Sequence, residues 1–160
     1  MLKLFKASKE HVLVAVCDGT VIPMEEVPDP VFSEKMMGEG IAFLPKGNRF
    51  VAPADVTIKF VPETKHAIGM TLDSGMGMIM HIGLDTVHLK GHGFTVFCKE
   101  GQKVKKGDLL VEVSEELMQR EDVSLITPLV IVDHEDFGSF KCNLGSEAKA
   151  GETQVVIYSR

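Results

Sequence analysis

Two segments decide the fold, His66-Ala-Ile-Gly-Met-Thr-Leu72 and Gly77-Met-Ile-Met-His81-Ile82. Each is a short run dominated by apolar residues, and the turn residues Asp73-Ser74-Gly75 lie between them. Short apolar runs separated by such a turn are typical of two antiparallel strands joined as a hairpin. We therefore predict a β-hairpin over this region.

The register of this hairpin determines how its two histidines meet. If the loop is the two residues Asp73-Ser74, Leu72 pairs with Gly75 and His66 lies directly opposite His81. Directly paired residues have Cβ atoms ~5 Å apart. A three-residue loop would instead place the two histidines on opposite faces. Because two-residue loops are the commonest hairpin connections, we expect the facing arrangement.

The rest of the chain repeats the pattern of short β-rich segments separated by turns. Many short strands at this spacing favour an all-β fold, an antiparallel β-sandwich or a barrel. We predict further strands over residues 11–16, 20–22, 40–44, 49–52, 56–61, 94–98, 109–113, 125–132 and 153–158.

Helix signals are limited to one or two very short turns. Asp29-Pro30 can cap and open one turn that Gly38 stops, and Ser114 can open another over Glu115–Met118. We see no linker and assign residues 1–160 to a single domain. Within it, residues 1–10 are either a flexible, frayed end or a small basic amphipathic tail.

One internal echo suggests two related β-units packed together. Val14-Ala-Val-Cys-Asp-Gly-Thr-Val21 aligns with Val51-Ala-Pro-Ala-Asp-Val-Thr-Ile58 at an offset of 37 residues.

Composition excludes several classes of protein. Apolar residues make up 44% of the 160 residues and the formal net charge is −6, which argues against a nucleic-acid binder. No apolar run approaches the ~20 residues of a membrane span, and charged residues interrupt the first ten positions, so we expect no signal peptide. Three widely spaced cysteines indicate a reducing compartment, and we expect a cytoplasmic protein.

The paired histidines carry the strongest chemical signal. Each imidazole could be half-buried and satisfied by a backbone carbonyl, but two facing rings titrate as a coupled unit. Such a pair suits either a transition metal or one transferable anionic group. On the strand face of His66, Thr64 could orient a ring nitrogen, whereas Asp85 could meet a basic partner or only stabilise a turn. The four methionines of the hairpin are typical of a core, although they also suit docking.

The chain resembles the glucose-family enzyme IIA of the bacterial phosphoenolpyruvate-dependent sugar phosphotransferase system. The resemblance extends from about Val14 to the C-terminus. Its main motif is Gly77-Met-Ile-Met-His81-Ile-Gly83-Leu-Asp85-Thr86-Val87, preceded by Thr64-Lys-His66-Ala and by Val27-Pro-Asp29-Pro-Val-Phe-Ser-Glu-Lys-Met-Met-Gly38. Further blocks follow in the family's order, among them Leu89–Phe94, Glu100–Asp108 and Leu125–Val130.

The resemblance implies a β-sandwich or barrel-like fold of the duplicated hybrid motif type and a phosphohistidine carrier. By motif, His81 matches the phosphoacceptor, His66 the residue that stabilises the phosphoryl group, and Thr64 its hydrogen-bonding support. Asp29 and Asp85 match acidic residues that meet arginines of the upstream carrier. The surrounding apolar positions implied as partner contacts are Phe32, Met37, Ile68 and Ile79.

The same resemblance implies the partners. The histidine-containing phosphocarrier protein would be upstream, and a cysteine of an enzyme IIB domain of a membrane sugar permease downstream, with regulatory protein targets in addition. No cofactor and no nucleic acid are implied, and the sugar is not specified. Proline at positions 30 and 62, and Pro53-Ala-Asp55-Val56 where the family commonly has Pro-Val-Asp-Gly, depart from the pattern and bear on which partners dock.

Two alternatives belong to other classes. His81-x-x-x-Asp85 is similar to the first ligand motif of lysostaphin-like zinc hydrolases, but their His-x-His motif is absent. A weak or partner-completed zinc site at His66 and His81 is compatible with the carrier reading. The Glu100–Leu110 segment is similar to turns of biotinyl and lipoyl carrier domains, but the Met-Lys-Met of those domains is absent.

Overall fold

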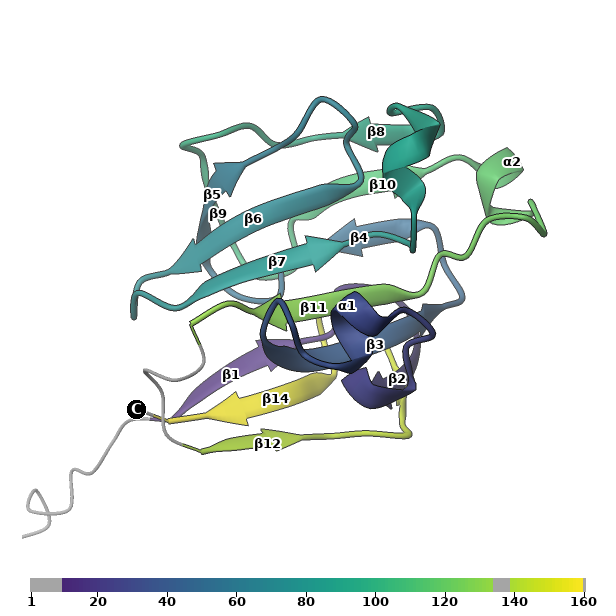
Figure 1. Cartoon of the computed structure of the whole chain (residues 1–160). Helices are drawn as coiled ribbons and strands as arrows, with labels where there is room; N and C mark the ends of the chain where they lie inside the picture. The colour runs from purple at the N-terminus through teal and green to yellow at the C-terminus, as the bar shows by residue number, and fades with distance from the viewer. Residues whose placement is uncertain (1–9, 134–138, 160) are drawn as a thin grey trace, which may run out of the picture.

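The protein is an antiparallel β structure in a computed structural model that describes residues 10–133 and 139–159. Its strands form three sheets (Figure 1). The eight-stranded sheet has the order β13 (Glu147–Ala148), β2 (Gly19–Pro23), β3 (Glu39–Pro45), β11 (Thr127–Ile131), β7 (Gly77–His81), β6 (Ala67–Leu72), β5 (Val56–Phe60) and β9 (Lys103–Val104). The two three-stranded sheets are β1 (His11–Val14), β14 (Gln154–Tyr158), β12 (Phe140–Cys142), and β4 (Arg49–Val51), β10 (Leu109–Val113), β8 (Phe94–Val96).

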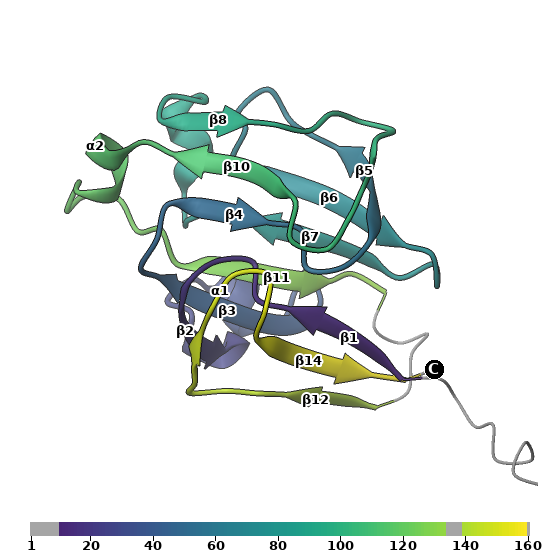
Figure 2. The same ribbon diagram turned by 180° about the vertical axis from the view of Figure 1, so that it is seen from behind.

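The small sheets lie behind the large one and enclose the core with it. In the view from behind, β1, β14 and β12 and then β4, β10 and β8 lie in front of the large sheet (Figure 2). The main core draws buried apolar side chains from all three sheets, including Leu13, Phe43, Phe50, Met80 and Val111. This arrangement confirms the predicted all-β sandwich, with its apolar surface removed from water between the layers.

Strict alternation along β6 and β7 divides the large sheet into two faces. Ile68, Met70 and Leu72 of β6, and Met78 and Met80 of β7, enter the main core. The residues between them lie on the opposite, outer face, because successive side chains of a strand point to opposite sides. The methionines of the hairpin, Met76 included, are thus core residues with at most 1% of their surface exposed, and none is available for docking.

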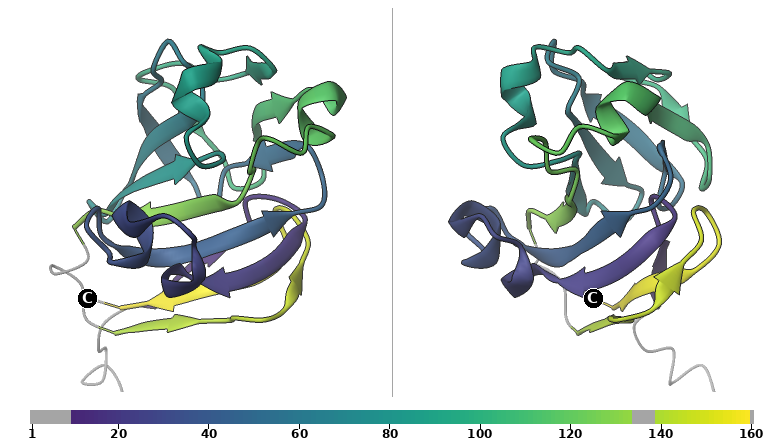
Figure 3. Two further views of the ribbon diagram at one scale, coloured as in Figure 1. Left: turned by 45° about the vertical axis from the view of Figure 1, so that its right-hand side comes forward. Right: turned by 90° about the vertical axis from the view of Figure 1, so that its right-hand side faces the viewer.

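A second, smaller cluster lies against the outer face. It consists of Met24, Val27, Phe32, Ala42 and Val130. The segment that covers this part of the sheet contains the 3-10 helix η2 (Met24–Glu26) and the single-turn helix α1 (Pro30–Ser33). Figure 3 shows this segment standing out from the side of the large sheet away from the small sheets.

Both predicted helical turns are confirmed by their caps. Asp29 accepts a hydrogen bond from the Val31 amide at the start of α1, as an N-cap residue does. Ser114 accepts one from the Leu117 amide at the start of α2 (Glu115–Met118). The first turn ends at Ser33, well before the predicted Gly38, and the left-handed Lys35 turns the chain away. A second 3-10 helix, η3 (Thr86–Leu89), was not predicted.

The internal echo corresponds to two segments that pair with each other. Val14 donates to the Pro53 carbonyl and Val51 donates to the Val16 carbonyl. The equivalent Asp18 and Asp55, 37 residues apart, each accept a hydrogen bond from a loop amide, those of Ala150 and Lys106. Ala15 and Ala52 are also equivalent in their backbone hydrogen bonds. Each donates its amide to a turn that contains a glycine and accepts a hydrogen bond from the amide of that glycine. The two related β-units therefore lie side by side around an approximate two-fold relation.

The predicted register of the β6–β7 hairpin is wrong by one residue. Thr71 pairs with Gly77 and Ala67 with His81, so the loop is Asp73-Ser74-Gly75 rather than Asp73-Ser74. Gly75 has a φ of +96°, a left-handed conformation that glycine adopts without strain. Three-residue hairpin loops use such a residue at their last position, and this choice overrides the general preference for two-residue loops.

Other differences concern short elements. The edge strands β9, β12 and β13 have two or three residues each and were not predicted, because so short a run has no readable alternation. Residues 1–9 of the predicted frayed end or amphipathic tail lie outside the described residues. No helix among residues 10–133 and 139–159 has the length and apolar character needed to cross a membrane.

Candidate functional site

His81 ends β7 on the outer face of the large sheet. Its Nδ1 lies 2.7 Å from the carbonyl oxygen of Gly83, and because a carbonyl only accepts, Nδ1–H is the donor. In the neutral ring this fixes the tautomer and leaves the lone pair on Nε2. Gly83 has a φ of +87°, and a Cβ there would lie 2.4 Å from Thr86 Cγ2 and 2.8 Å from the Ser124 carbonyl oxygen. Only glycine therefore fits the turn that aims this carbonyl at His81.

His66 reaches His81 although it does not pair with it. In the observed register His66 lies opposite Ile82, whose amide donates to the His66 carbonyl oxygen. His66 precedes β6, and Lys65 before it has a left-handed φ of +59°, so strand alternation does not fix its direction. The two imidazoles meet edge to face with ring centroids 4.9 Å apart. The predicted proximity is confirmed, but a bend produces it rather than direct pairing.

Thr64 supports His66 from the preceding turn. Its Oγ1 lies 2.8 Å from His66 Nδ1. When the hydroxyl donates this hydrogen bond, the second ring nitrogen of His66 carries the proton and is a donor. The pair Thr64 and His66 can therefore present an N–H group beside His81.

Both imidazoles have pKa values below the ordinary value of histidine. Burial lowers the pKa of His81, while the Gly83 hydrogen bond and the charges of Asp29 and Asp85 act in the opposite direction. Burial also lowers the pKa of His66, the proximity of His81 lowers it further, and a hydrogen bond from the ring to the Thr64 backbone opposes them. Removal from water disfavours the charged form of a base. Near neutral pH both rings are therefore neutral, as a nucleophilic imidazole must be.

The α1 segment forms one wall of the site. Phe32 is only 4% exposed and its ring lies against that of His81, with centroids 5.1 Å apart. Asp29, the N-cap residue of the same helix, is close enough for its negative charge to raise the pKa of His81. Phe32 is a predicted partner contact, but its ring is buried against His81 and in the second cluster. It therefore contributes little to the exposed surface that a partner would touch.

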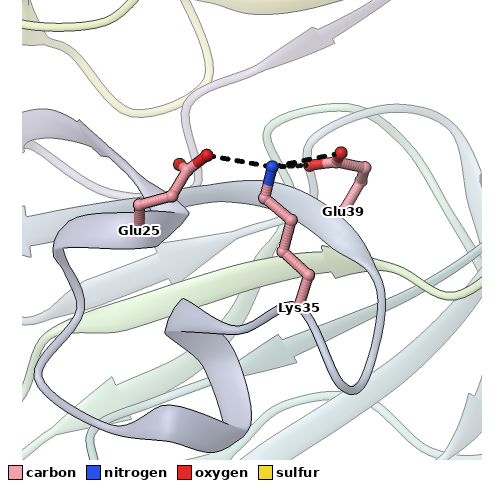
Figure 4. A network of polar contacts seen from close by, with 3 residues as sticks. All are labelled: Glu25, Lys35 and Glu39. Carbon is pink, nitrogen blue, oxygen red and sulfur yellow. Dashed lines mark hydrogen bonds and ion pairs between the residues drawn. The ribbon is translucent and has the colours of Figure 1, made fainter.

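An ion-pair network ties this wall to the sheet. Lys35 Nζ lies 2.9 Å from Glu25 Oε2 in η2 and 3.1 Å from Glu39 Oε1 in β3 (Figure 4). Exposed ion pairs contribute little to stability individually, but a shared lysine fixes three segments relative to one another. The network holds the loop between α1 and β3, next to the helix that contacts His81.

The other predicted residues divide into outer and inner positions. Asp85 is exposed, has a left-handed φ of +57°, and precedes η3 next to the site. Ile79 and Met37 are half-buried at the edge of the second cluster, on the face that carries His81. Ile68, by contrast, is completely buried in the main core and reaches no surface, because its position alternates with that of the outer-face residues.

Sequence reasoning missed three features that fix the backbone of the site. The Gly83 carbonyl sets the tautomer of His81, Lys65 provides the bend at His66, and Thr86 Oγ1 donates to the Ile82 carbonyl at 2.6 Å and so fixes the turn. The glycine two residues after His81 was a readable signal, since such a glycine often marks a positive φ. A lysine in the left-handed region gives no signal of this kind.

Within the part of the chain that the structure describes, no group of three or more His, Cys, Asp or Glu side chains is arranged to hold a metal ion. The site brings together two imidazoles, the Thr64 hydroxyl and two nearby carboxylates, those of Asp29 and Asp85.

Known proteins resemble this chain over most of its length. Residues 11–137 match the family described as phosphoenolpyruvate-dependent sugar phosphotransferase system, EIIA 1. The chain is 42% identical over 148 residues to the PTS system glucose-specific EIIA component of Halalkalibacterium halodurans, covering 92% of this chain and 86% of that protein. It is 40% identical over 145 residues to the mannose-specific EIIBCA component of Corynebacterium glutamicum, of which it spans 21%, while 91% of this chain is covered.

A solved structure also has the fold of this chain. The glucose permease IIA from Mycoplasma capricolum has a TM-score of 0.86 and 38% identity, covering 93% of this chain and 96% of that chain. This similarity supports neither the zinc-hydrolase alternative nor the biotinyl or lipoyl carrier. The chain belongs to the EIIA 1 family of the phosphoenolpyruvate-dependent sugar phosphotransferase system.

Proposed function

We propose that the protein is a phosphohistidine carrier that accepts a phosphoryl group on His81 and passes it on. The observation that carries this proposal is the hydrogen bond from His81 Nδ1 to the Gly83 carbonyl, beside the second imidazole of His66. It leaves Nε2 of His81 as the nucleophile. A relay needs a group that attacks readily and leaves readily, and neutral imidazole does both near neutral pH.

In the accepting step, the Nε2 lone pair of His81 attacks the phosphorus of a phosphohistidine on the upstream carrier. The new N–P bond forms as the bond to the donor ring breaks, and its electron pair returns to that ring. The donor ring keeps a proton on its other nitrogen and leaves as neutral imidazole. His81 then bears both Nδ1–H and the phosphoryl group, and the Gly83 carbonyl and the nearby carboxylates stabilise the positive charge that develops on its ring.

His66 and Thr64 stabilise the phosphoryl group during transfer. Phosphoryl transfer depends mainly on in-line positioning and on donors to the equatorial oxygens. With the Thr64 hydroxyl donating to Nδ1, the Nε2–H of His66 can donate to one of these oxygens. In the passing step, a cysteine thiolate of an enzyme IIB domain attacks the phosphorus, the N–P bond breaks, and its electron pair returns to Nε2 of His81.

The partner classes follow from the family, and the finer assignments are part of the proposal. We assign the histidine-containing phosphocarrier protein as donor and a IIB domain of a sugar permease as acceptor, in the cytoplasm. Asp29 and Asp85 lie near His81, where they can meet cationic side chains of the donor, since complementary charges accelerate encounter. The relatives are named for two different sugars, glucose and mannose. We therefore propose the carrier role for this chain and assign no sugar to it.

The test is reconstitution of the relay with the full chain. The chain is incubated with phosphoenolpyruvate and the two general upstream proteins of the system, and the modified residue is mapped by mass spectrometry. We expect one phosphoryl group on His81, dependent on the upstream carrier. Phosphate on any other residue, or none on the chain when the carrier itself is phosphorylated, contradicts the proposal.

A further inference from the structure

Phe60 is a large apolar side chain that the structure turns out of the core and onto the face of the phosphoacceptor. It is the last residue of β5, and 41% of its surface is exposed. The inward residues of this strand are Val56 and Ile58, both buried in the main core. By simple alternation Phe60 would follow them inward.

A β-bulge prevents this. Ile58 pairs with Met70 of β6, whereas Phe60, two residues on, pairs with Gly69, so the register shifts between Ile58 and Phe60. A bulge inserts one residue and re-aims the side chains that follow it, and bulges are enriched beside functional sites. Here it turns Phe60 to the outer face.

The ring occupies space that a glycine leaves open. A Cβ at Gly69 would lie 2.3 Å from both Cδ1 and Cε1 of Phe60, so the ring lies directly over Gly69. Gly69 itself has no positive φ, so its conformation does not call for glycine. Because Gly69 has no side chain, the Phe60 ring can lie directly over its backbone.

This ring lies within reach of any protein that touches His81. Gly69 pairs with Ile79, and the neighbouring outer-face pair is Ala67 with His81. Gly69 and His81 are thus diagonal neighbours, about 7–8 Å apart in an antiparallel sheet. Phe60, Gly69 and Ile79 form a strip across three strands, which we call the Phe60 strip, immediately beside the phosphoacceptor.

We propose that Phe60, seated on Gly69, is a specificity-determining contact for the upstream phosphocarrier, which presents an apolar side chain to the Phe60 strip and cationic groups to Asp29 and Asp85. This inference rests on the proposed function. The interface of phosphoryl exchange must include the surface around His81, and the strip is continuous with it. An exposed aromatic ring at the centre of an interface is a frequent source of binding energy.

A double-mutant cycle tests the inference, with Phe60→Ala, Gly69→Ala and the double variant. The readout is kcat/KM for phosphorylation of His81 by the phosphorylated histidine-containing phosphocarrier protein. We expect Phe60→Ala to lower it about tenfold. Gly69→Ala should lower it by a similar factor because its methyl group displaces the ring, but should have less than a twofold effect in the Phe60→Ala background, where no ring is left to displace.

Three controls separate docking from chemistry and from folding. Phosphoramidate, a small phosphoryl donor that needs no docking surface, should phosphorylate the native chain and all variants at equal rates. Phe97→Ala removes another half-exposed phenylalanine, which follows β8 in a different sheet, and should leave transfer from the carrier unchanged. Thermal unfolding midpoints confirm that each variant is folded.

The contrary outcomes are distinct. Unchanged carrier transfer in Phe60→Ala overturns the inference, and so does an equal loss with phosphoramidate, which would make Phe60 a support of His81. A loss confined to onward transfer to a IIB domain assigns the strip to the downstream partner and also overturns it. A native chain that neither donor phosphorylates on His81 overturns the proposed function itself.

Discussion

The two faces of β6 and β7 are built from the same strands but perform different tasks. On the inner face, Ile68, Met78 and Met80 are buried to at least 99% and pack against the other sheets. On the outer face, Ile79 and His81 are half-buried, and glycine or alanine occupies the paired positions of β6. The inner face holds the layers together, and the outer face keeps reactive groups within reach of another protein.

The comparison shows why a site can be placed on so short a hairpin. Close packing on the inner face fixes the backbone of each strand. Because the outer-face side chains are attached to the same backbone, their positions are fixed as well. The outer face can therefore carry polar groups in defined positions without a deep pocket. The following variants test this separation of tasks, beginning with the largest expected effect.

Replacing His81, the proposed phosphoacceptor, should remove function without removing the fold. We expect His81→Gln to accept no measurable phosphoryl group from the upstream carrier, because the nucleophilic nitrogen is absent, while its unfolding midpoint stays close to that of the native chain. Phosphorylation by labelled phosphoenolpyruvate with the upstream proteins measures this. His88→Gln, an exposed histidine in η3, is the matched control and should be labelled normally. A labelled His81→Gln chain would refute the assignment.

Replacing the supporting imidazole should separate acceptance from transfer. We expect His66→Gln to be phosphorylated on His81 but to pass the group onward at least ~100-fold more slowly, since the flexible glutamine amide replaces an imidazole N–H that Thr64 holds in position beside His81. Single-turnover transfer to a IIB domain gives the rate. If acceptance and onward transfer fall by the same factor, His66 acts on the nucleophile rather than on the phosphoryl group.

Truncation on the inner face should have the opposite signature. Met80→Ala opens a cavity in the main core and should lower the free energy of unfolding by about 2–5 kcal/mol. The chain that remains folded should still be phosphorylated on His81. Urea denaturation measures the loss, with Met36→Ala as control because that methionine is 70% exposed. Equal destabilisation by both substitutions would show that the two faces do not differ as described.

The smallest expected effect is a pH dependence of stability. Burial places the folded-state pKa values of His66 and His81 below their unfolded values, so the unfolded chain binds more protons as pH falls. Their contribution is complete above pH ~6.5 and is lost as pH drops through the folded pKa values. Unfolding midpoints between pH 8 and 5 should fall, and should fall less in His81→Gln. A slope unaffected by that substitution contradicts the burial effect.

Much of the fold and part of the site could be predicted from the sequence, for local reasons. The caps Asp29 and Ser114 act within three residues of themselves, and the apolar run of β7 is visible along the chain. The hairpin register was predicted wrongly, because the two competing loops differ by one residue and the prediction followed the general preference for two-residue loops. Ile68 was assigned to the wrong face, since burial depends on what packs above a strand.

The chain by itself determined that strands would form and that two histidines, His66 and His81, flank one hairpin, but the register predicted for that hairpin was wrong. Only the tertiary structure decided how they meet: through the left-handed Lys65, the carbonyl of Gly83, and Phe32, which arrives from a segment far away in the sequence. The tertiary structure also decided the β-bulge that exposes Phe60. Local patterns fix backbone preferences, whereas side-chain direction and burial depend on contacts between distant segments.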